Sequence, residues 1–331
     1  MAKLRRSMFF TLAILALIFT ALISISLGAV KIPLEEIIAV FTGSGGGTNR
    51  TIIFNLRLPR VLASALVGLG LSVVGTFFQG LLRNPMADPY VLGISSGAAF
   101  GATLAIILGL GLFGLSFAAF VSSLLVVFFV YIISRSGRKI SMNTMLLAGI
   151  AISAFISALI SLLMLLNHEE FNRIIFWTMG GFNITSWNTI AFSAPIILIG
   201  SSIMYVFSRD LNVILTGEET AEHLGVNTEL VKRIILILGS LVTATCVSIG
   251  GIIGFVGLII PHISRLVVGP DNRILLPFSG LVGATFLIFA DTLVRFLLRP
   301  TEIPIGIITA SFGGPFFLYL LIRNKRNKEG M

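Results

Sequence analysis

The chain carries a series of apolar segments that are each about as long as a membrane crossing, and this feature limits its fold more than any other. A helix needs about 20 apolar residues to cross a bilayer. Ten segments come close to that length, and they are residues 8–28, 61–82, 91–111, 115–134, 143–166, 188–207, 232–250, 252–268, 274–297 and 304–322. The sequence therefore predicts an all-α polytopic membrane protein with a single transmembrane domain over residues 1–331.

The stretch 234–261 decides between nine and ten crossings. As one helix it would be roughly 40 Å long, which is more than one crossing needs. Lys232 lies just before it and Arg265 just after its end, and basic flanks are typical of cytoplasmic loops. We therefore predict that the chain turns back near Gly251.

The distribution of basic residues gives the expected orientation. Lys and Arg number 23 and Asp and Glu 14, and most of the basic residues fall in short clusters between apolar segments. This pattern is typical of cytoplasmic membrane loops and does not indicate a nucleic-acid surface. Only seven basic residues fall at the outer face in this arrangement, and they are Lys31, Arg50, Arg57, Arg60, Arg173, Arg295 and Arg299. Both termini are then cytoplasmic.

The order of the spans suggests an internal symmetry. The four spans within 61–166 begin at the outer face, and the four within 232–322 begin at the inner face. This arrangement is expected of an inverted repeat, in which two halves cross the membrane in opposite directions. Little residue identity relates the halves, so the repeat rests on topology.

Motifs of catalysis and metal binding do not occur in the sequence. The run Gly43–Gly47 lacks the Gly-Lys-Ser/Thr that completes a phosphate-binding P-loop. His168, His223 and His262 lie in different segments, far from metal-ligand spacing. We therefore predict no enzyme activity, no catalytic or metal-binding residue and no cofactor. Active transport would draw its energy from another subunit or from an ion gradient.

Several polar and Pro- or Gly-rich signatures lie between the apolar segments. They are Arg57–Arg60, Arg83–Pro89, Gly217–Ala221 with Leu224 and Gly225, Gly254–Leu258, Pro261 and His262 with Arg265, Asp271–Arg273, Pro304–Gly306 and Gly313–Pro315. In this order and spacing the chain resembles the FecCD-type permeases of iron–siderophore, haem and vitamin B12 importers, from about residue 10 to 322. It departs from the usual family pattern at Thr216 and Asn272, which affects only local contacts.

The resemblance implies a fold and a set of partners. It implies a vitamin B12 importer permease-like subunit of an ATP-binding-cassette importer in the bacterial cytoplasmic (inner) membrane, in contact with lipid. A second permease copy, two ATPase subunits and an extracytoplasmic substrate-binding protein would complete the assembly. The cargo would be an iron–siderophore or similar metal chelate, with haem or cobalamin as alternatives. A short gate helix is expected between His168 and Trp187.

The resemblance also assigns roles to two groups of residues. The loop 212–228 would dock on the ATPase through Gly217, Glu218, Glu219, Ala221, Leu224 and Gly225. From the residues alone, acidic side chains suit the start of a short helix and Gly225 its end, which also fits an ordinary solvated loop. Arg57, Arg60 and Arg295 would meet acidic residues of the binding protein, although such residues also serve as lipid anchors.

An ion-coupled secondary transporter is the rival interpretation. It would need ionisable groups at mid-membrane, because these carry the coupling ion. Asp291 is the only acidic residue within a predicted span, and Arg295 lies one helical turn further on, where the two side chains can pair. The sequence therefore favours a structural ion pair over a proton relay.

Overall fold

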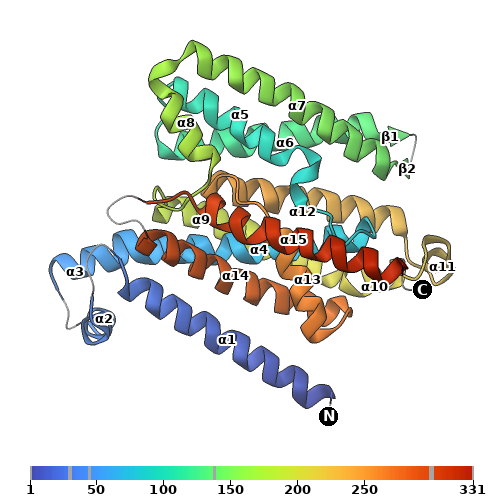
Figure 1. Cartoon of the computed structure of the whole chain (residues 1–331), viewed down its shortest axis with the longest axis horizontal. Coiled ribbons are helices and arrows are strands. Elements are labelled where there is room, and N and C mark those ends of the chain that lie inside the picture. The colour runs from blue at the N-terminus through green and yellow to red at the C-terminus, as the bar shows by residue number, and fades with distance from the viewer. Residues whose placement is uncertain (1, 29–31, 44–45, 137–138, 298–301, 330–331) are drawn as a thin grey trace.

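The computed structural model describes residues 2–28, 32–43, 46–136, 139–297 and 302–329, which are almost entirely helical (Figure 1). The α-helices are α1 (Ala2–Ser26), α2 (Leu34–Phe41), α3 (Thr48–Thr51), α4 (Leu58–Leu81), α5 (Ile94–Ile107), α6 (Leu112–Ser134), α7 (Met142–Leu166), α8 (Phe171–Thr178), α9 (Trp187–Val206), α10 (Ser208–Ile214), α11 (Glu218–His223), α12 (Thr228–Gly250), α13 (Val256–Val268), α14 (Asn272–Leu297) and α15 (Ile305–Glu329). Between them lie the π-helical turn η1 (Ile52–Arg57), the 3-10 turns η2 (Pro89–Leu92) and η3 (His168–Glu170), and the antiparallel strands β1 (Arg135–Ser136) and β2 (Lys139–Ile140).

Helices overlap all ten segments that the sequence indicates. Seven helical stretches of the described chain are long and apolar enough to cross a membrane: α1, the continuous helix Thr48–Leu81, α6, α7, α9, α12 and α14. Three shorter apolar helices complete the set: α5, α13 and the part of α15 up to Tyr319. The beginning of α1 and the end of α15 lie at the same end of the bundle (Figure 1), as an even number of crossings requires.

Two of the predicted segments are shorter in the structure than in the sequence analysis. The sequence predicts one helix over 91–111, but α5 begins only at Ile94, because Gly93 has a left-handed backbone with φ 80°. Similarly, α13 begins only at Val256, after Phe255 with φ 69°. A left-handed residue cannot be part of a right-handed helix, so each of the two short helices begins only after its left-handed residue.

The two halves of the bundle are related as an inverted repeat. Helices α4–α7 have 24, 14, 23 and 25 residues, and α12–α15 have 23, 13, 26 and 25. Contacts repeat as well, because α4 packs on α13 and α14 just as α12 packs on α5 and α6. Helices α4 and α12 run in opposite directions (Figure 1). The repeat inferred from topology is therefore confirmed.

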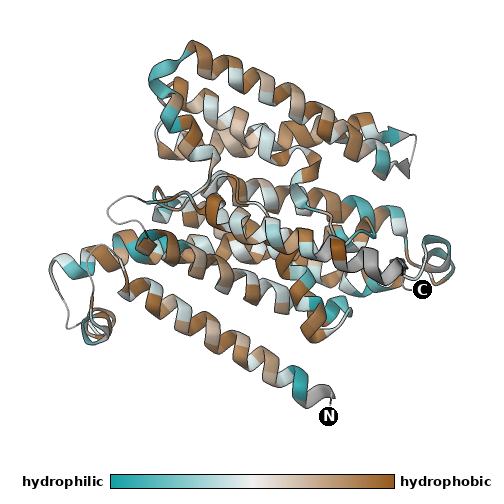
Figure 2. Ribbon diagram, viewed as in Figure 1, coloured by the Kyte–Doolittle hydropathy of each residue, from teal (hydrophilic) through white to brown (hydrophobic). Residues whose placement is uncertain are grey.

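Helices α4 and α12 form the centre of the molecule, and α1 and α7 lie at its periphery. In their most apolar stretches, 78% of the residues are buried in the helix containing α4, but only 11% in α7. Figure 2 shows apolar residues along the outward surfaces of α1 and α7. Close packing of α4 on α14 depends on small residues, because a side chain at Gly68 would collide with the backbone of Gly283.

The loops and short helices gather at two opposite ends of the bundle (Figure 1). One end carries β1, β2, α10 and α11, and we call it the α11 end. The other carries α2, α3 and α8, and we call it the α8 end. The two groups of residues to which the sequence assigns roles lie at opposite ends.

Candidate functional site

The α8 end contains a cluster of charged side chains that includes all three predicted docking arginines. Arg57 ends η1, Arg60 lies in the first turn of α4, and Arg295 lies in the last turn of α14. The structure brings them together with Asp291 and Glu302. We call these five residues the arginine cluster.

Arg57 and Arg295 bind the C-terminal end of α1. The Nη1 atom of Arg57 donates hydrogen bonds to the carbonyl oxygens of Ile25 at 2.5 Å and Ser26 at 2.9 Å. Arg295 donates to the carbonyl oxygens of Ser24 and Leu27 at 3.3 and 3.2 Å. The last carbonyls of a helix lack intrahelical partners and carry partial negative charge, so the two cations stabilise the end of α1.

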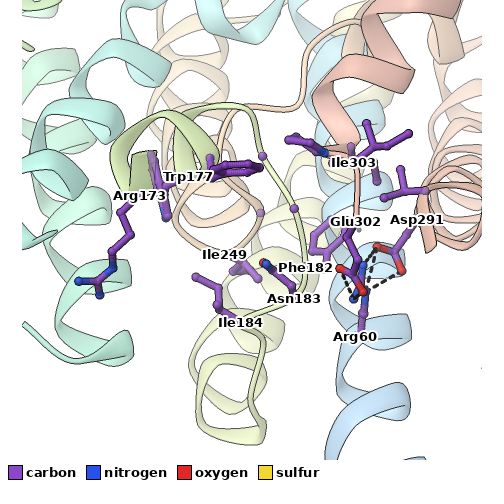
Figure 3. Close-up of a pocket in the computed structure, with 18 of the residues that line it drawn as sticks. Arg60, Arg173, Trp177, Phe182, Asn183, Ile184, Ile249, Asp291, Glu302 and Ile303 are labelled. Carbon is purple, nitrogen blue, oxygen red and sulfur yellow. Dashed lines mark hydrogen bonds and ion pairs between the residues drawn. The ribbon is translucent and has the colours of Figure 1, made fainter. Parts of the chain in front are cut away.

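Asp291 is the buried centre of the arginine cluster. Its side chain is 1% exposed, and its carboxylate accepts hydrogen bonds from Arg60 at 2.9–3.0 Å and lies 3.2 Å from Nε of Arg295. Glu302, 42% exposed, lies 3.0 Å from the other side of the Arg60 guanidinium (Figure 3). The predicted pairing of Asp291 with Arg295 is therefore correct, but spacing along one helix gave no sign of Arg60 or Glu302.

Burial limits what the arginine cluster can offer to a partner. Arg57 is 6% exposed, and the side chains of Arg60 and Arg295 are 12% and 8% exposed. Three cations face two carboxylates, so the cluster keeps a net positive charge. Direct contact with another protein is restricted to the edges of these guanidinium groups.

A cavity of about 200 Å³ lies beside the arginine cluster. Arg60, Glu302, Phe182 and Trp177 of α8 are among the residues that line it (Figure 3). Helix α8 occupies the stretch in which the sequence predicts a short gate helix. The turn after α8 is joined to two membrane helices by backbone hydrogen bonds, because Gly181 N–H donates to the Gly250 carbonyl at 2.8 Å and Ile305 N–H to the Gly180 carbonyl at 3.0 Å.

At the α11 end, helix α11 has well-defined boundaries. Its first turn carries Glu218 and Glu219, where negative charge suits the helix dipole. It ends at His223, and Gly225, two residues further on, has a left-handed backbone with φ 83°. Gly225 N–H donates to the Glu222 carbonyl at 3.0 Å, and the next N–H reaches back to Ala221 at 2.9 Å. This is a Schellman motif, in which glycine is strongly preferred.

The six residues predicted to contact an ATPase lie on different sides of α11. Ala221 is fully buried. Glu218 points toward α12, with its carboxylate 2.6 Å from the buried Lys232 Nζ. Glu219, Leu224 and Gly225 are exposed, and Leu224 is an apolar side chain with 68% exposure. Of the six, Glu218, Glu219, Leu224 and Gly225 are therefore accessible, Ala221 is buried, and Glu218 also ties the helix to α12.

Polar contacts join α10 to α14. The side-chain amide of Asn212 donates to Asp271 at 2.7 Å and accepts from the backbone and side chain of Asn272 at 2.9 and 2.8 Å. Hydrogen bonds from the Arg273 guanidinium, aided by Asn212, lower the pKa of Asp271 from its usual value to about 2. Asn272, a departure from the family pattern, thus donates both its backbone N–H and its side-chain amide to Asn212. The sequence analysis did not predict this contact.

Within the described residues, no three or more His, Cys, Asp or Glu side chains lie close enough together to hold a metal ion. The arrangement instead provides an ion-paired α8 end, an exposed acidic helix at the α11 end and apolar helices between them.

Comparison with known proteins agrees with this organisation. The profile of the FecCD transport family matches residues 16–323. The chain is 44% identical over 275 residues to the cobalamin import system permease protein BtuC of Halobacterium salinarum, covering 83% of this chain and 74% of the relative. It is 36% identical over 324 residues to the hemin transport system permease protein HmuU of Yersinia pestis, covering 96% of each chain.

A solved structure gives the same result for the fold. It is described as an inward-facing conformation of a putative metal-chelate type ABC transporter, and it superposes with a TM-score of 0.85 at 35% sequence identity, covering 96% of this chain and 99% of that chain. These matches extend over nearly the whole length, so the chain is a multi-pass membrane protein with the fold of an ABC importer permease. It belongs to the FecCD transport family.

Proposed function

We propose that this chain is the membrane-spanning subunit of an ATP-binding-cassette importer that carries an iron–siderophore or similar metal chelate into the cytoplasm. The observation that carries the proposal is the family match over residues 16–323. The solved relative, described as a putative metal-chelate type transporter, supports this class of cargo. Haem and cobalamin are the alternatives, since two relatives are named for hemin and cobalamin.

The α11 end would face the cytoplasm of a bacterial cell. Basic residues such as Arg83, Arg209 and Arg273 lie at the ends of helices there, and cytoplasmic loops carry an excess of such residues. Both chain ends would then be cytoplasmic and the arginine cluster extracytoplasmic. The apolar outward surfaces of α1 and α7 would contact lipid or a second copy of the chain.

Two copies would enclose the transport path, with an ATPase subunit below each one. ATP hydrolysis would take place in those subunits, and this chain would not itself be an enzyme. The exposed part of α11, which includes Glu219, Leu224 and Gly225, is suited to dock in an ATPase surface. Its firm attachment through Glu218 and Lys232 supports this role, because a docking helix must transmit force to the membrane helices.

The binding protein would dock at the α8 end. The arginine cluster keeps a net positive charge there, which would orient an acidic partner. Since Arg57, Arg60 and Arg295 are mostly buried, we expect the attraction to act through their summed field rather than through new ion pairs.

The ion-driven alternative lacks a suitable acidic residue. Asp291 is held by both Arg60 and Arg295, so its carboxylate already serves two ion pairs. A residue that exchanges protons during transport needs a carboxylate that is not held in two ion pairs. This contact therefore supports an energy source outside the chain.

Uptake into proteoliposomes tests the proposal. The permease would be reconstituted with its ATPase and binding protein, with ATP enclosed, and supplied with labelled ferric hydroxamate, haemin or cobalamin. We expect ATP-dependent accumulation of the ferric chelate. Accumulation of only haemin or cobalamin would show that this compound is the cargo instead of a ferric chelate. Uptake driven by a proton or sodium gradient without ATP would contradict an ATP-binding-cassette importer.

A further inference from the structure

Arg83 occupies a backbone position that favours glycine. Its φ is 47°, in the left-handed region, and it follows the last turn of α4. Its N–H donates to the Gly80 carbonyl at 3.1 Å, and the N–H of Asn84 reaches the Gln79 carbonyl at 3.1 Å. This is the Schellman ending that also terminates α11, where the equivalent residue is Gly225. An L-residue with a long side chain is disfavoured in this conformation, so the side chain must contribute something that the backbone does not.

The side chain of Arg83 reaches the connection between α10 and α11. Its Nη2 atom donates a hydrogen bond of 2.9 Å to the carbonyl oxygen of Ile214, the last residue of α10. The same carbonyl accepts a hydrogen bond of 3.1 Å from the N–H of Gly217, the residue immediately before α11. One carbonyl thus joins the end of α4 to the start of the exposed helix α11.

A second contact fixes α10 against the same end of α4. Leu211 is fully buried, and an added Cβ at Gly80 would lie only 3.1 Å from its side chain. Helix α4 in turn packs on α12, α13 and α14 in the centre of the bundle. A displacement of α10 and α11 therefore has a direct mechanical route to the central helices, through Leu211 inside and Arg83 at the exposed rim.

We propose that Arg83 is a positioning residue that transmits movement of α10 and α11 to α4 during transport. This inference rests on the proposed function, in which an ATPase moves α11. The guanidinium keeps its hydrogen bond to the Ile214 carbonyl as the two helices shift together. The left-handed backbone directs the side chain across the gap to α10.

Replacement by glycine separates this role from a structural one. Glycine is the best residue for the backbone of position 83, so Arg83→Gly keeps the helix end and lowers its strain. We expect a melting temperature equal to or above that of the wild type, and unchanged binding of the ATPase. In the complete complex in nanodiscs, stimulation of ATP hydrolysis by the binding protein should fall at least about fivefold, the lower range of coupling between distant sites.

Two further variants complete the experiment. Arg209→Ala removes an exposed basic residue from α10 itself and should leave the stimulation unchanged, while Arg83→Lys should restore part of it. Wild-type stimulation in Arg83→Gly would overturn the inference, because the residue would then be only a helix end. Loss of ATPase binding in Arg83→Gly would overturn it as well, since Arg83 would then build the docking segment. Wild-type protein that binds no ATPase would instead refute the proposed function.

Discussion

The two ends of the molecule use charged residues in opposite ways. At the α8 end the arginine cluster is turned inward, and Asp291 is 1% exposed between two guanidinium groups. At the α11 end the acidic helix is turned outward, with Glu219 exposed beside Leu224 at 68% exposure. Charge at the first end holds helices together, whereas at the second end Glu218 ties α11 to α12 and Glu219 is left available to a partner.

This difference indicates where substitution should affect stability and where it should affect function. A buried ion pair that loses one member leaves an uncompensated charge in a medium of low dielectric constant. An exposed helix can lose a side chain at little cost to the fold, yet lose its contact with another protein. Substitutions in the arginine cluster should therefore mainly change stability, and substitutions on the exposed side of α11 should mainly change transport.

The largest effect is expected for Asp291→Asn. The substitution keeps the shape but leaves Arg60 and Arg295 without their shared buried carboxylate, which should destabilise the protein by about 3–5 kcal/mol. Glu302→Gln is the matched control, because it removes the exposed partner of the same Arg60 and should cost about 0–1 kcal/mol. Thermal unfolding of the purified variants provides the comparison. Equal losses would show that burial does not distinguish the two carboxylates.

The next effect concerns the end of α11. Gly225→Pro forces φ to about −65° and removes the N–H that donates to Glu222, so the Schellman ending cannot form. We expect the protein to fold while ATP-dependent uptake falls at least about fivefold. Glu219→Arg should act in the same direction by reversing an exposed charge.

Gly225→Asn is the control for backbone geometry, because asparagine tolerates the left-handed region better than other L-residues. It should keep most of the uptake. Full activity of Gly225→Pro would show that α11 has no role in coupling.

Several features of the structure could be predicted from the sequence alone. Segment length predicts the ten apolar helices, and Gly225 with the acidic residues before it predicts both ends of α11. These are local signals, set by a few neighbouring residues. The break before α5 was missed, because hydropathy does not report that Gly93 adopts a left-handed conformation.

Long-range contacts were not accessible from the sequence. Asp291 and Arg295 are one turn apart, so their pair was predicted, but Arg60 is 231 residues away in sequence from Asp291. The contact of Asn212 with Asn272 likewise joins helices that only tertiary packing brings together. The distinction between buried and exposed residues of α11 depends on the same packing.

A smaller effect is expected for docking at the α8 end. If the arginine cluster attracts an acidic binding protein, Glu302→Gln raises its net positive charge and should strengthen binding, by roughly 0.2–1 kcal/mol. The double variant Arg57→Glu/Arg60→Glu should weaken binding, but it also breaks the ion pair of Arg60 with Asp291, so Glu302→Gln is the cleaner test. Both changes should diminish at high salt, because salt screens the field of the cluster in the solvent between it and the partner. The measurement is the affinity of the binding protein for each variant across a salt series. Weaker binding to Glu302→Gln than to the wild type would refute attraction by the arginine cluster.

The smallest effect is a pH dependence at Asp271. Its folded-state pKa, about 2, lies below the ordinary value of 3.8 because of hydrogen bonds from Arg273 and Asn212. A depressed pKa contributes stability that is fully present above the ordinary value and is lost as the pH falls through about 2. Asp271→Asn should therefore differ from the wild type in melting temperature at pH 6 and converge with it near pH 2. A difference in melting temperature that is the same at both pH values would show that the charge of Asp271 does not cause it.

Site-specific photo-cross-linking of the assembled transporter shows directly which end of the chain contacts the ATPase. A photoreactive residue would replace Leu224 at the α11 end or, as the matched control, Asn183, an exposed residue beside the cavity at the α8 end. We expect that the photoreactive residue at position 224 captures the ATPase subunit and that the one at position 183 does not. Capture of the ATPase from position 183 and not from 224 would contradict both the orientation and the assignment of α11.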